Sequence, residues 1–86
     1  MKTIYKYTLT GRYTTEIEMP VGAEIIHFAE QQGQYCIWAM VNPDADKEKR
    51  TFTVVGTGWE LDDDVDHRHI GSVFDGPFVW HILEIV

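Results

Sequence analysis

The stretch EIIHFAEQQGQYCIWAMV, residues 24–41, decides the fold class of this chain because it has the pattern of a β-hairpin. Two runs of strand-forming residues, 24–30 and 35–41, flank QQGQ, a short glycine-containing loop of the kind that joins antiparallel strands. The second run is apolar on both faces, which is typical of a strand buried inside a sheet. The hairpin therefore predicts a β fold with residues 35–41 as its central strand.

The residues before this hairpin alternate between apolar and polar side chains, and a period of two indicates strands. Residues 3–9 and 13–19 both show the alternation, and TGR, residues 10–12, stands between them as a short turn. We therefore expect these two runs to form a second hairpin with one face in contact with solvent.

The residues after the central hairpin predict further strands separated by polar loops. NPDADKEKR, residues 42–50, has charges of both signs and a proline, which indicates a solvated loop with one brief helical turn at most. Residues 51–55 form a strand-like run, and ELDDDVDH, residues 60–67, forms an acidic loop. RHIGSVF and FVWHILEIV then predict a last hairpin at the end of the chain.

For this last hairpin, a loop of three residues, Asp75–Pro77, is favoured over a loop of two. The longer loop gathers the apolar side chains on one face and keeps the proline out of the hydrogen-bonded ladder. In this register Phe74 pairs with Phe78. The same register places Arg68 opposite Glu84.

Together these patterns predict a single all-β domain over residues 1–86, with about seven short antiparallel strands in a compact sandwich or partly open barrel. A chain of 86 residues has a thin core, and its three Trp, four Tyr and four Phe side chains would supply much of it. Four of them are expected to be mostly buried: Trp38, Phe52, Phe74 and Trp80.

The charge, the hydropathy and the single cysteine of the chain limit its partners and its environment. Fourteen acidic side chains against seven lysines and arginines give a net charge of −7, which argues against binding to a phosphate backbone. No run approaches the ~20 apolar residues of a membrane span, so no membrane partner is expected. Cys36, the only cysteine, has apolar neighbours, which predicts a buried and unreactive thiol in a reducing cytoplasm.

The acidic loop resembles the start of a calcium-binding loop, because Asp62, Asp64 and Asp66 stand at alternate positions. An EF-hand then needs Gly at its sixth and Glu at its twelfth position, which here are His67 and Val73. The loop is therefore expected to be solvated and to offer an acidic face to a basic partner. This acidic face consists of Asp62, Asp63, Asp64 and Asp66.

The preferred register of the last hairpin places three histidines on one face: His67, His69 and His81. His69 and His81 become cross-strand neighbours ~7–8 Å apart, within reach of a shared metal ion. No cysteine or acid joins them at a motif spacing, so the pattern favours exposed or hydrogen-bonded histidines over a metal centre. No cofactor is expected.

Signatures of the common enzyme classes are absent from the sequence. There is no G-x-S-x-G elbow, no phosphate-binding G-x-x-x-x-G-K and no H-E-x-x-H. Ser72, His81 and Asp75 could be assembled into a catalytic trio, but any small protein offers such trios. We therefore expect a protein that is not an enzyme.

The strongest indication of a binding site is RTFTVVGTGWE, residues 50–60. Glycines let a ligand approach the backbone closely, an adjacent tryptophan offers a stacking face, and a nearby arginine can hold a phosphate. The same residues also suit a bulge and a turn with the tryptophan covering the core, and both interpretations stay open. The candidate site for a ligand or partner consists of Arg50, Gly56, Thr57, Gly58 and Trp59.

Several segments, taken in order, carry a resemblance to a known family: KTIYKY, EMPVGAEI, IWAMVNPDADKEKRTF, GTGWE, HIGSVF and VWHILEI. Over nearly the whole chain they resemble a largely uncharacterised family of short proteins encoded by bacteriophages and prophages. The combination of MPVGA with WAMVNPDA and GTG is the specific part. In that family a histidine often follows G-T-G, where this chain has Trp59.

The resemblance implies a viral accessory protein in the cytoplasm of an infected bacterium, and it implies no reaction. We expect non-catalytic binding, by a counter-defence inhibitor that blocks a host immune protein or sequesters a small nucleotide signal. The alternatives are an accessory β module of the virion or its assembly, and a metal-dependent enzyme built on the histidine face. A thin core and unpaired sheet edges favour a homo-oligomer, by default a C2 dimer.

Overall fold

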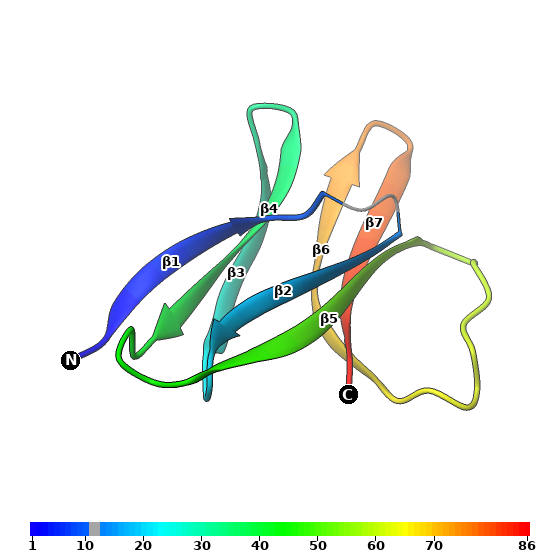
Figure 1. Cartoon of the computed structure of the whole chain (residues 1–86). Coiled ribbons are helices and arrows are strands. Elements are labelled where there is room, and N and C mark those ends of the chain that lie inside the picture. The colour runs from blue at the N-terminus through cyan, green and yellow to red at the C-terminus, as the bar shows by residue number, and fades with distance from the viewer. Residues whose placement is uncertain (11–12) are drawn as a thin grey trace.

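The computed structural model describes residues 1–10 and 13–86, and these residues form seven β-strands and no helix (Figure 1). The strands are β1 (Thr3–Thr8), β2 (Thr14–Pro20), β3 (Glu24–Gln31), β4 (Gln34–Val41), β5 (Lys47–Gly56), β6 (His67–Asp75) and β7 (Phe78–Ile85). The predicted all-β class is therefore confirmed. None of the described residues lies in a helix that could span a membrane.

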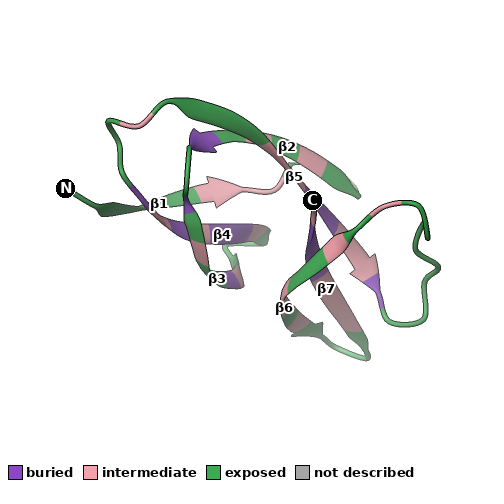
Figure 2. Ribbon diagram, turned by 90° about the horizontal axis from the view of Figure 1, so that it is seen from below, coloured by how far each residue is buried: buried purple, intermediate pink, exposed green. Residues whose placement is uncertain are grey.

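The strands form two antiparallel sheets that are not closed into a barrel. One sheet has the order β1-β4-β3 and the other has the order β2-β5-β7-β6. The sheets pack on each other, with β3 of the first lying against β6 of the second. Buried residues concentrate in β4, β5 and β7, the strands that have a neighbour on both sides (Figure 2).

The predicted central hairpin is present as β3 and β4. Its two turn residues, Gln32 and Gly33, have positive φ angles of 53° and 80°. Positive φ at both positions lets a two-residue hairpin turn match the right-handed twist of the strands that it joins. β4 lies between β1 and β3, and Ile37 at its middle is 0% exposed. The apolar character of both faces of residues 35–41 thus indicated the central strand correctly.

β1 and β2 do not form the predicted hairpin, because they belong to different sheets. β1 pairs with β4, and β2 pairs with β5. The Leu9 N–H donates to the carbonyl of Tyr35 at 2.9 Å, whereas the Val54 N–H donates to the carbonyl of Tyr13 at 2.8 Å. The chain therefore passes from one sheet to the other between Leu9 and Tyr13, and the turn expected at residues 10–12 lies partly outside the described residues.

The last hairpin closes with a two-residue turn, so the predicted three-residue loop is wrong. Asp75 pairs with Phe78, and Gly76 in the turn has a φ of 56°, which a two-residue hairpin turn needs at this position. A slip of one residue moves a side chain to the other face of a sheet. Phe74 is accordingly 81% exposed, where the predicted register buried it.

Further from the turn, the same hairpin returns to the predicted pairing. A β-bulge between His69 and Gly71 takes up the extra residue of β6. Beyond this bulge Arg68 lies opposite Glu84, as predicted. The bulge explains why the predicted register of this hairpin is wrong next to the loop and correct at the opposite end.

Between the sheets lies a core whose largest fully buried side chains are Met19, Val41, Ile37, Phe52 and Ile82. Cys36 is also buried, as predicted, but it lies outside this cluster. Phe52 is 1% exposed, which confirms its predicted place in the core. Trp38 and Trp80 are only partly buried. The core is therefore mostly aliphatic, and most of the aromatic side chains lie at its margins.

Candidate functional site

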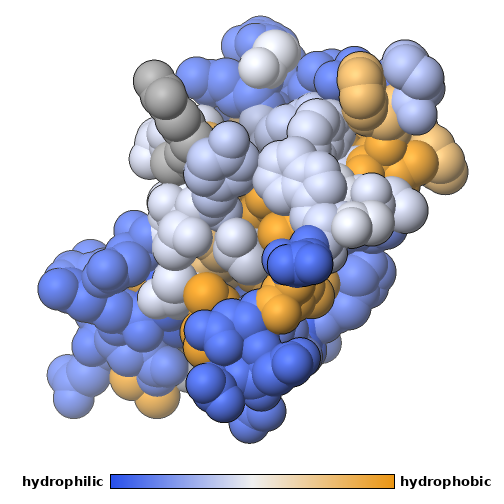
Figure 3. Space-filling view, turned by 90° about the vertical axis from the view of Figure 1, so that its right-hand side faces the viewer, coloured by the Kyte–Doolittle hydropathy of each residue, from blue (hydrophilic) through white to orange (hydrophobic). Residues whose placement is uncertain are grey.

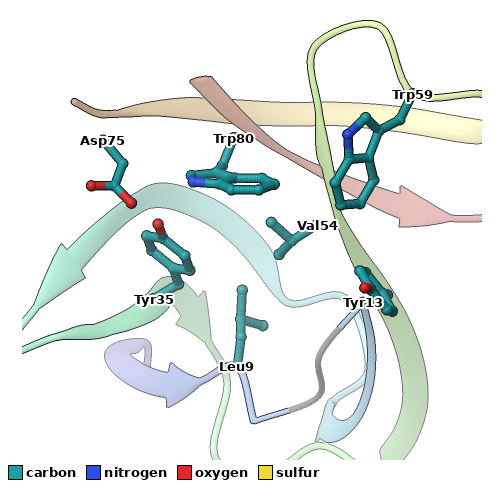
Figure 4. A pocket seen from close by; sticks show the side chains of 7 residues that line it. All are labelled: Leu9, Tyr13, Tyr35, Val54, Trp59, Asp75 and Trp80. Carbon is teal, nitrogen blue, oxygen red and sulfur yellow. The ribbon is translucent and has the colours of Figure 1, made fainter. Parts of the chain in front are cut away.

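A pocket of about 430 Å³ opens between the sheets, where the last residues of β5 and β6 meet the first residues of β2, β4 and β7. We call it the aromatic pocket, because four of its seven lining side chains are Tyr or Trp (Figure 4). Its lining residues are Leu9, Tyr13, Tyr35, Val54, Trp59, Asp75 and Trp80. The close-up shows these side chains converging from both sheets and from the loop after β5.

The segment GTGW, which follows β5, forms a tight turn at the edge of this pocket. The Trp59 N–H donates to the carbonyl of Gly56 at 3.1 Å, and Gly58 has a φ of 88°. A positive φ at the third residue of such a turn is the mark of a type II turn, and glycine adopts it without strain. Gly58 is therefore explained by the turn alone.

Gly56 has a different reason, which is packing against Trp59. A Cβ atom at Gly56 would lie 2.8 Å from Nε1 of the Trp59 indole, closer than any real contact of this kind. Glycine at this position lets the indole lie directly on the backbone of β5. The two glycines thus turn the chain and seat a tryptophan at the pocket. The role of the segment as a binding site stays a prediction.

The rings at the pocket meet edge to face and form a corner. The Trp59 and Trp80 ring centroids are 5.5 Å apart at an interplanar angle of 84°, and those of Tyr13 and Trp59 are 5.7 Å apart at 60°. Aromatic pairs favour such edge-to-face arrangements, which hold the rings in place. Trp59 is nevertheless 46% exposed and Tyr13 59% exposed, so their faces are accessible from solvent.

On the opposite side of the pocket, the Tyr35 hydroxyl points toward the Asp75 carboxylate (Figure 4). Burial raises the pKa of Tyr35, and the negative charges of Asp75 and Glu30 and a hydrogen bond with Asp75 raise it further. Tyr35 therefore stays protonated and can donate to the carboxylate at neutral pH. Asp75 is the one charged side chain among the described residues that line the pocket.

A second hollow of about 250 Å³ lies next to the aromatic pocket, and Trp59 and Trp80 belong to the walls of both. Phe78 stacks on Trp80 at a centroid distance of 5.9 Å and is 58% exposed. On the face turned to the viewer in Figure 3, orange and pale side chains occupy the middle, with strongly hydrophilic ones above and below them. Among the described residues that line the two hollows, Asp75 is the one charged side chain.

Arg50 does not line the aromatic pocket, so the structure does not bring it together with Trp59 as the sequence analysis expected. Arg50 lies six positions before Gly56 on the extended strand β5, a distance of roughly 20 Å. Its guanidinium is engaged by the buried Glu84, with Nε donating to Oε2 at 2.6 Å and Nη2 donating to Oε1 at 2.7 Å. A third donor, Nη1, bonds the carbonyl of Ala23. Arg50 is therefore a structural residue whose donors are used within the fold.

The histidine face forms a row of hydrogen bonds on the outside of β6 and β7. Ser72 Oγ lies 2.8 Å from Nδ1 of His81 and 3.2 Å from Nε2 of His69, and Thr57 Oγ1 lies 2.8 Å from Nε2 of His81. The two histidine rings are 5.9 Å apart, which agrees with their predicted closeness. Because a threonine hydroxyl occupies the second nitrogen of His81, no carboxylate orients this ring as it would in a catalytic triad.

The remaining predicted site residues do not join the pocket. His67 is partly buried at the start of β6, and in the part of the chain that the structure describes no three His, Cys, Asp or Glu side chains are grouped as metal ligands would be. The acidic face is exposed in the loop between β5 and β6, where the Asp64 N–H donates to Oδ1 of Asp62 at 2.8 Å. Its role as a partner surface stays a prediction.

Comparison with known proteins places the whole chain in one family. Residues 1–86 match the family model described as Domain of unknown function (DUF7352). The chain belongs to this family. No curated protein and no solved structure matches it. Because the family description carries no activity, the function of this family member has to be argued from its site.

Sequence reasoning found Thr57 and Trp59 near the pocket but missed most of its walls. Tyr13, Tyr35 and Asp75 come from strands or turns that are far apart in sequence and were assigned only to local hairpins. Trp80 was assigned to the core. The available signal was the excess of aromatic residues over what so thin a core can enclose. That excess indicates an exposed aromatic surface without locating it.

Proposed function

We propose that this protein is a non-catalytic binding protein whose partner docks on the aromatic pocket. The observation that carries the proposal is the exposure of several rings at one place, with Tyr13, Trp59 and Phe78 each about half exposed. Contiguous apolar surface on a small protein is unfavourable in water unless a partner covers it. Tyr and Trp are also the residues that contribute most to binding energy in protein interfaces.

A protein partner fits this surface better than a nucleotide does. A nucleotide needs cationic donors for its phosphates. The charged side chain among the described lining residues is the carboxylate of Asp75, and the chain as a whole carries a net charge of −7. Arg50, the expected phosphate ligand, is bonded to Glu84 instead. Repulsion between like charges therefore favours docking to a protein over sequestering a nucleotide signal.

The biological setting that we propose is counter-defence in the cytoplasm of a bacterium infected by a phage. Its support is the resemblance to short phage and prophage proteins in the order and spacing of KTIYKY, EMPVGAEI and GTGWE. A small acidic protein that covers one surface of a host immune protein would need no catalytic group. Such an inhibitor acts in proportion to its amount, because each molecule blocks one target.

The proposal is tested by phage plating on bacteria that express single immune systems, with and without this protein. Wild type should restore plating on at least one system, and Trp59→Ala should lose most of that protection. Tyr5→Ala is the matched control, since Tyr5 is a comparably exposed aromatic, at 42%, on β1 outside the pocket lining. Circular dichroism melts would show that all three proteins are folded. Protection that Trp59→Ala retains in full, or protection from no system by wild type, would overturn the proposal.

A further inference from the structure

The walls of the aromatic pocket present π systems to whatever occupies it. The Trp59 and Trp80 rings meet at 84°, so the planes of the two rings are nearly perpendicular to each other. Tyr13 continues this corner, at 60° to Trp59. The faces of aromatic rings carry partial negative charge and attract cations within about 6 Å of the ring centre. Rings that meet at such angles can contact one cation from more than one side.

A full negative charge stands on the same hairpin as Trp80 and across the pocket from Trp59 and Tyr13 (Figure 4). The Asp75 carboxylate lies at the Tyr35 side, and the Tyr35 hydroxyl points toward it. Because Tyr35 supplies one donor and a carboxylate can accept several, acceptor capacity remains on Asp75 for a further donor. The described lining residues include no Lys or Arg that could neutralise it.

The rest of the lining is aliphatic. Leu9 and Val54 lie between the Tyr35 side and the Trp59 side of the pocket (Figure 4). Long basic side chains carry an apolar stem and a charged head, and they bury the stem along apolar surface while the head finds polar partners. The pocket offers both kinds of contact in a volume of about 430 Å³.

We propose that the aromatic pocket binds an arginine side chain exposed on the partner protein. The inference rests on the proposed function and adds the chemistry of the contact. The guanidinium stacks on the Trp59 and Trp80 corner and donates to Asp75, and the methylene stem lies on Leu9 and Val54. Arginine fits better than lysine because its planar group stacks on rings and offers several fixed donors to a carboxylate.

Two small probes that differ in one charge test the inference: N-acetyl-arginine methylamide and its neutral citrulline isostere. The three indole N–H signals in a ¹⁵N-correlated NMR spectrum report the result residue by residue. The arginine probe should shift the signals of Trp59 and Trp80. Trp38 is the internal control, because it lies on β4 against His27, with ring centroids 5.4 Å apart, and outside the pocket lining. We expect the arginine probe to bind roughly 5-fold more tightly than the citrulline probe.

Variants then identify the residues responsible. Asp75→Asn should reduce the affinity for the arginine probe roughly 3- to 5-fold and leave the affinity for the citrulline probe unchanged. Asp44→Asn makes the same charge change in the exposed loop between β4 and β5 and should have no effect. Trp59→Ala should abolish the shift at Trp80. Phe74→Ala removes an aromatic ring that is 81% exposed, next in sequence to Asp75 and outside the pocket lining, and it should leave binding intact.

The outcomes separate this inference from the proposed function. Equal binding of the two probes, or no shift at Trp59 and Trp80 with either of them, overturns the arginine assignment. If phage protection still depends on Trp59 in that case, the pocket binds a partner by neutral contacts and the proposed function stands. Loss of affinity in Asp44→Asn equal to that in Asp75→Asn would also overturn the inference, because overall charge would then explain the preference.

Discussion

Strand β5 runs from a closed end of the molecule to an open end, and the two ends differ in how their side chains are used. At Arg50 a partly buried guanidinium is held by Glu84, which is 5% exposed, and by the carbonyl of Ala23. At Gly56 the strand ends under an indole that is 46% exposed. The first end satisfies its groups within the fold, whereas the second keeps ring faces and a carboxylate available to a partner.

The difference teaches which residues hold the fold and which are free for function. The Arg50 guanidinium also lies over the Phe52 ring, 5.9 Å from its centroid, so the closed end couples the ion pair to the core. In the described part of the chain, no buried side-chain nitrogen or oxygen lacks a hydrogen-bond partner. We therefore expect substitutions at the closed end to change stability and substitutions at the open end to change binding.

The largest effect is expected from Phe52→Ala, which should lower the free energy of unfolding by about 3–5 kcal/mol because it leaves a cavity in the core. A domain of this size has about 5–15 kcal/mol in total, so the variant should be close to unfolding at room temperature. The comparison is Val54→Ala, two residues closer to the open end and only partly buried. Urea denaturation measures both. Equal losses for the two variants would contradict the division into a closed and an open end.

Arg50→Ala should come next, with a loss of about 3 kcal/mol, because it leaves the buried Glu84 carboxylate without its main partner. Arg68, whose Nη1 is 3.8 Å from Glu84 Oε1, should keep the loss at the lower end of the range for buried pairs. The double variant Arg50→Met with Glu84→Met should be more stable than Arg50→Ala. At temperatures where it is folded, Arg50→Ala should bind the arginine probe as wild type does. A large loss of binding would contradict this expectation and show that Arg50 contributes to the binding site.

A smaller effect on stability, about 1 kcal/mol, is expected from Gly56→Ala, since the new methyl group must displace the Trp59 indole. The exposed indole can move, so the main result should be weaker binding of the arginine probe and altered tryptophan fluorescence. Gly71→Ala is the matched control, because its Cβ would lie 3.5 Å from the nearest atom, an ordinary contact. Similar fluorescence changes in the two variants would show that the close packing of Trp59 on Gly56 does not cause the change.

The smallest effect concerns pH and the Tyr35–Asp75 pair at the open end. Because burial and then Asp75 raise the pKa of Tyr35 above 10.0, its neutral form is favoured in the folded state. Its contribution to stability is fully present below pH 10.0 and is lost as the pH rises through the raised value. Tyr35→Phe should therefore show a shallower loss of stability above pH 10.0, measured by denaturation across that range. An unchanged slope would mean that the pair adds nothing to the fold.

What the sequence determined by itself was local. Alternation with a period of two located the strands, although residues 47–50, predicted as part of a solvated loop, belong to β5. The Gln32–Gly33 turn joined β3 to β4 with the correct partner. The apolar run of residues 35–41 gave the central strand. These features depend on neighbours within a few residues, since side-chain direction and turn conformation are set by adjacent backbone dihedrals.

The tertiary structure decided the partners of β1 and β2, the exposure of Phe74 and the place of Arg50. Alternation gives each strand an apolar face but does not determine which strand packs against it. A slip of one residue in a hairpin moves the side chains of a strand to the opposite face of the sheet. Arg50 and Glu84 are 34 positions apart in the chain, and the aromatic pocket draws its walls from both sheets. Such contacts form only when the sheets pack, because burial rewards apolar area without specifying which segments supply it.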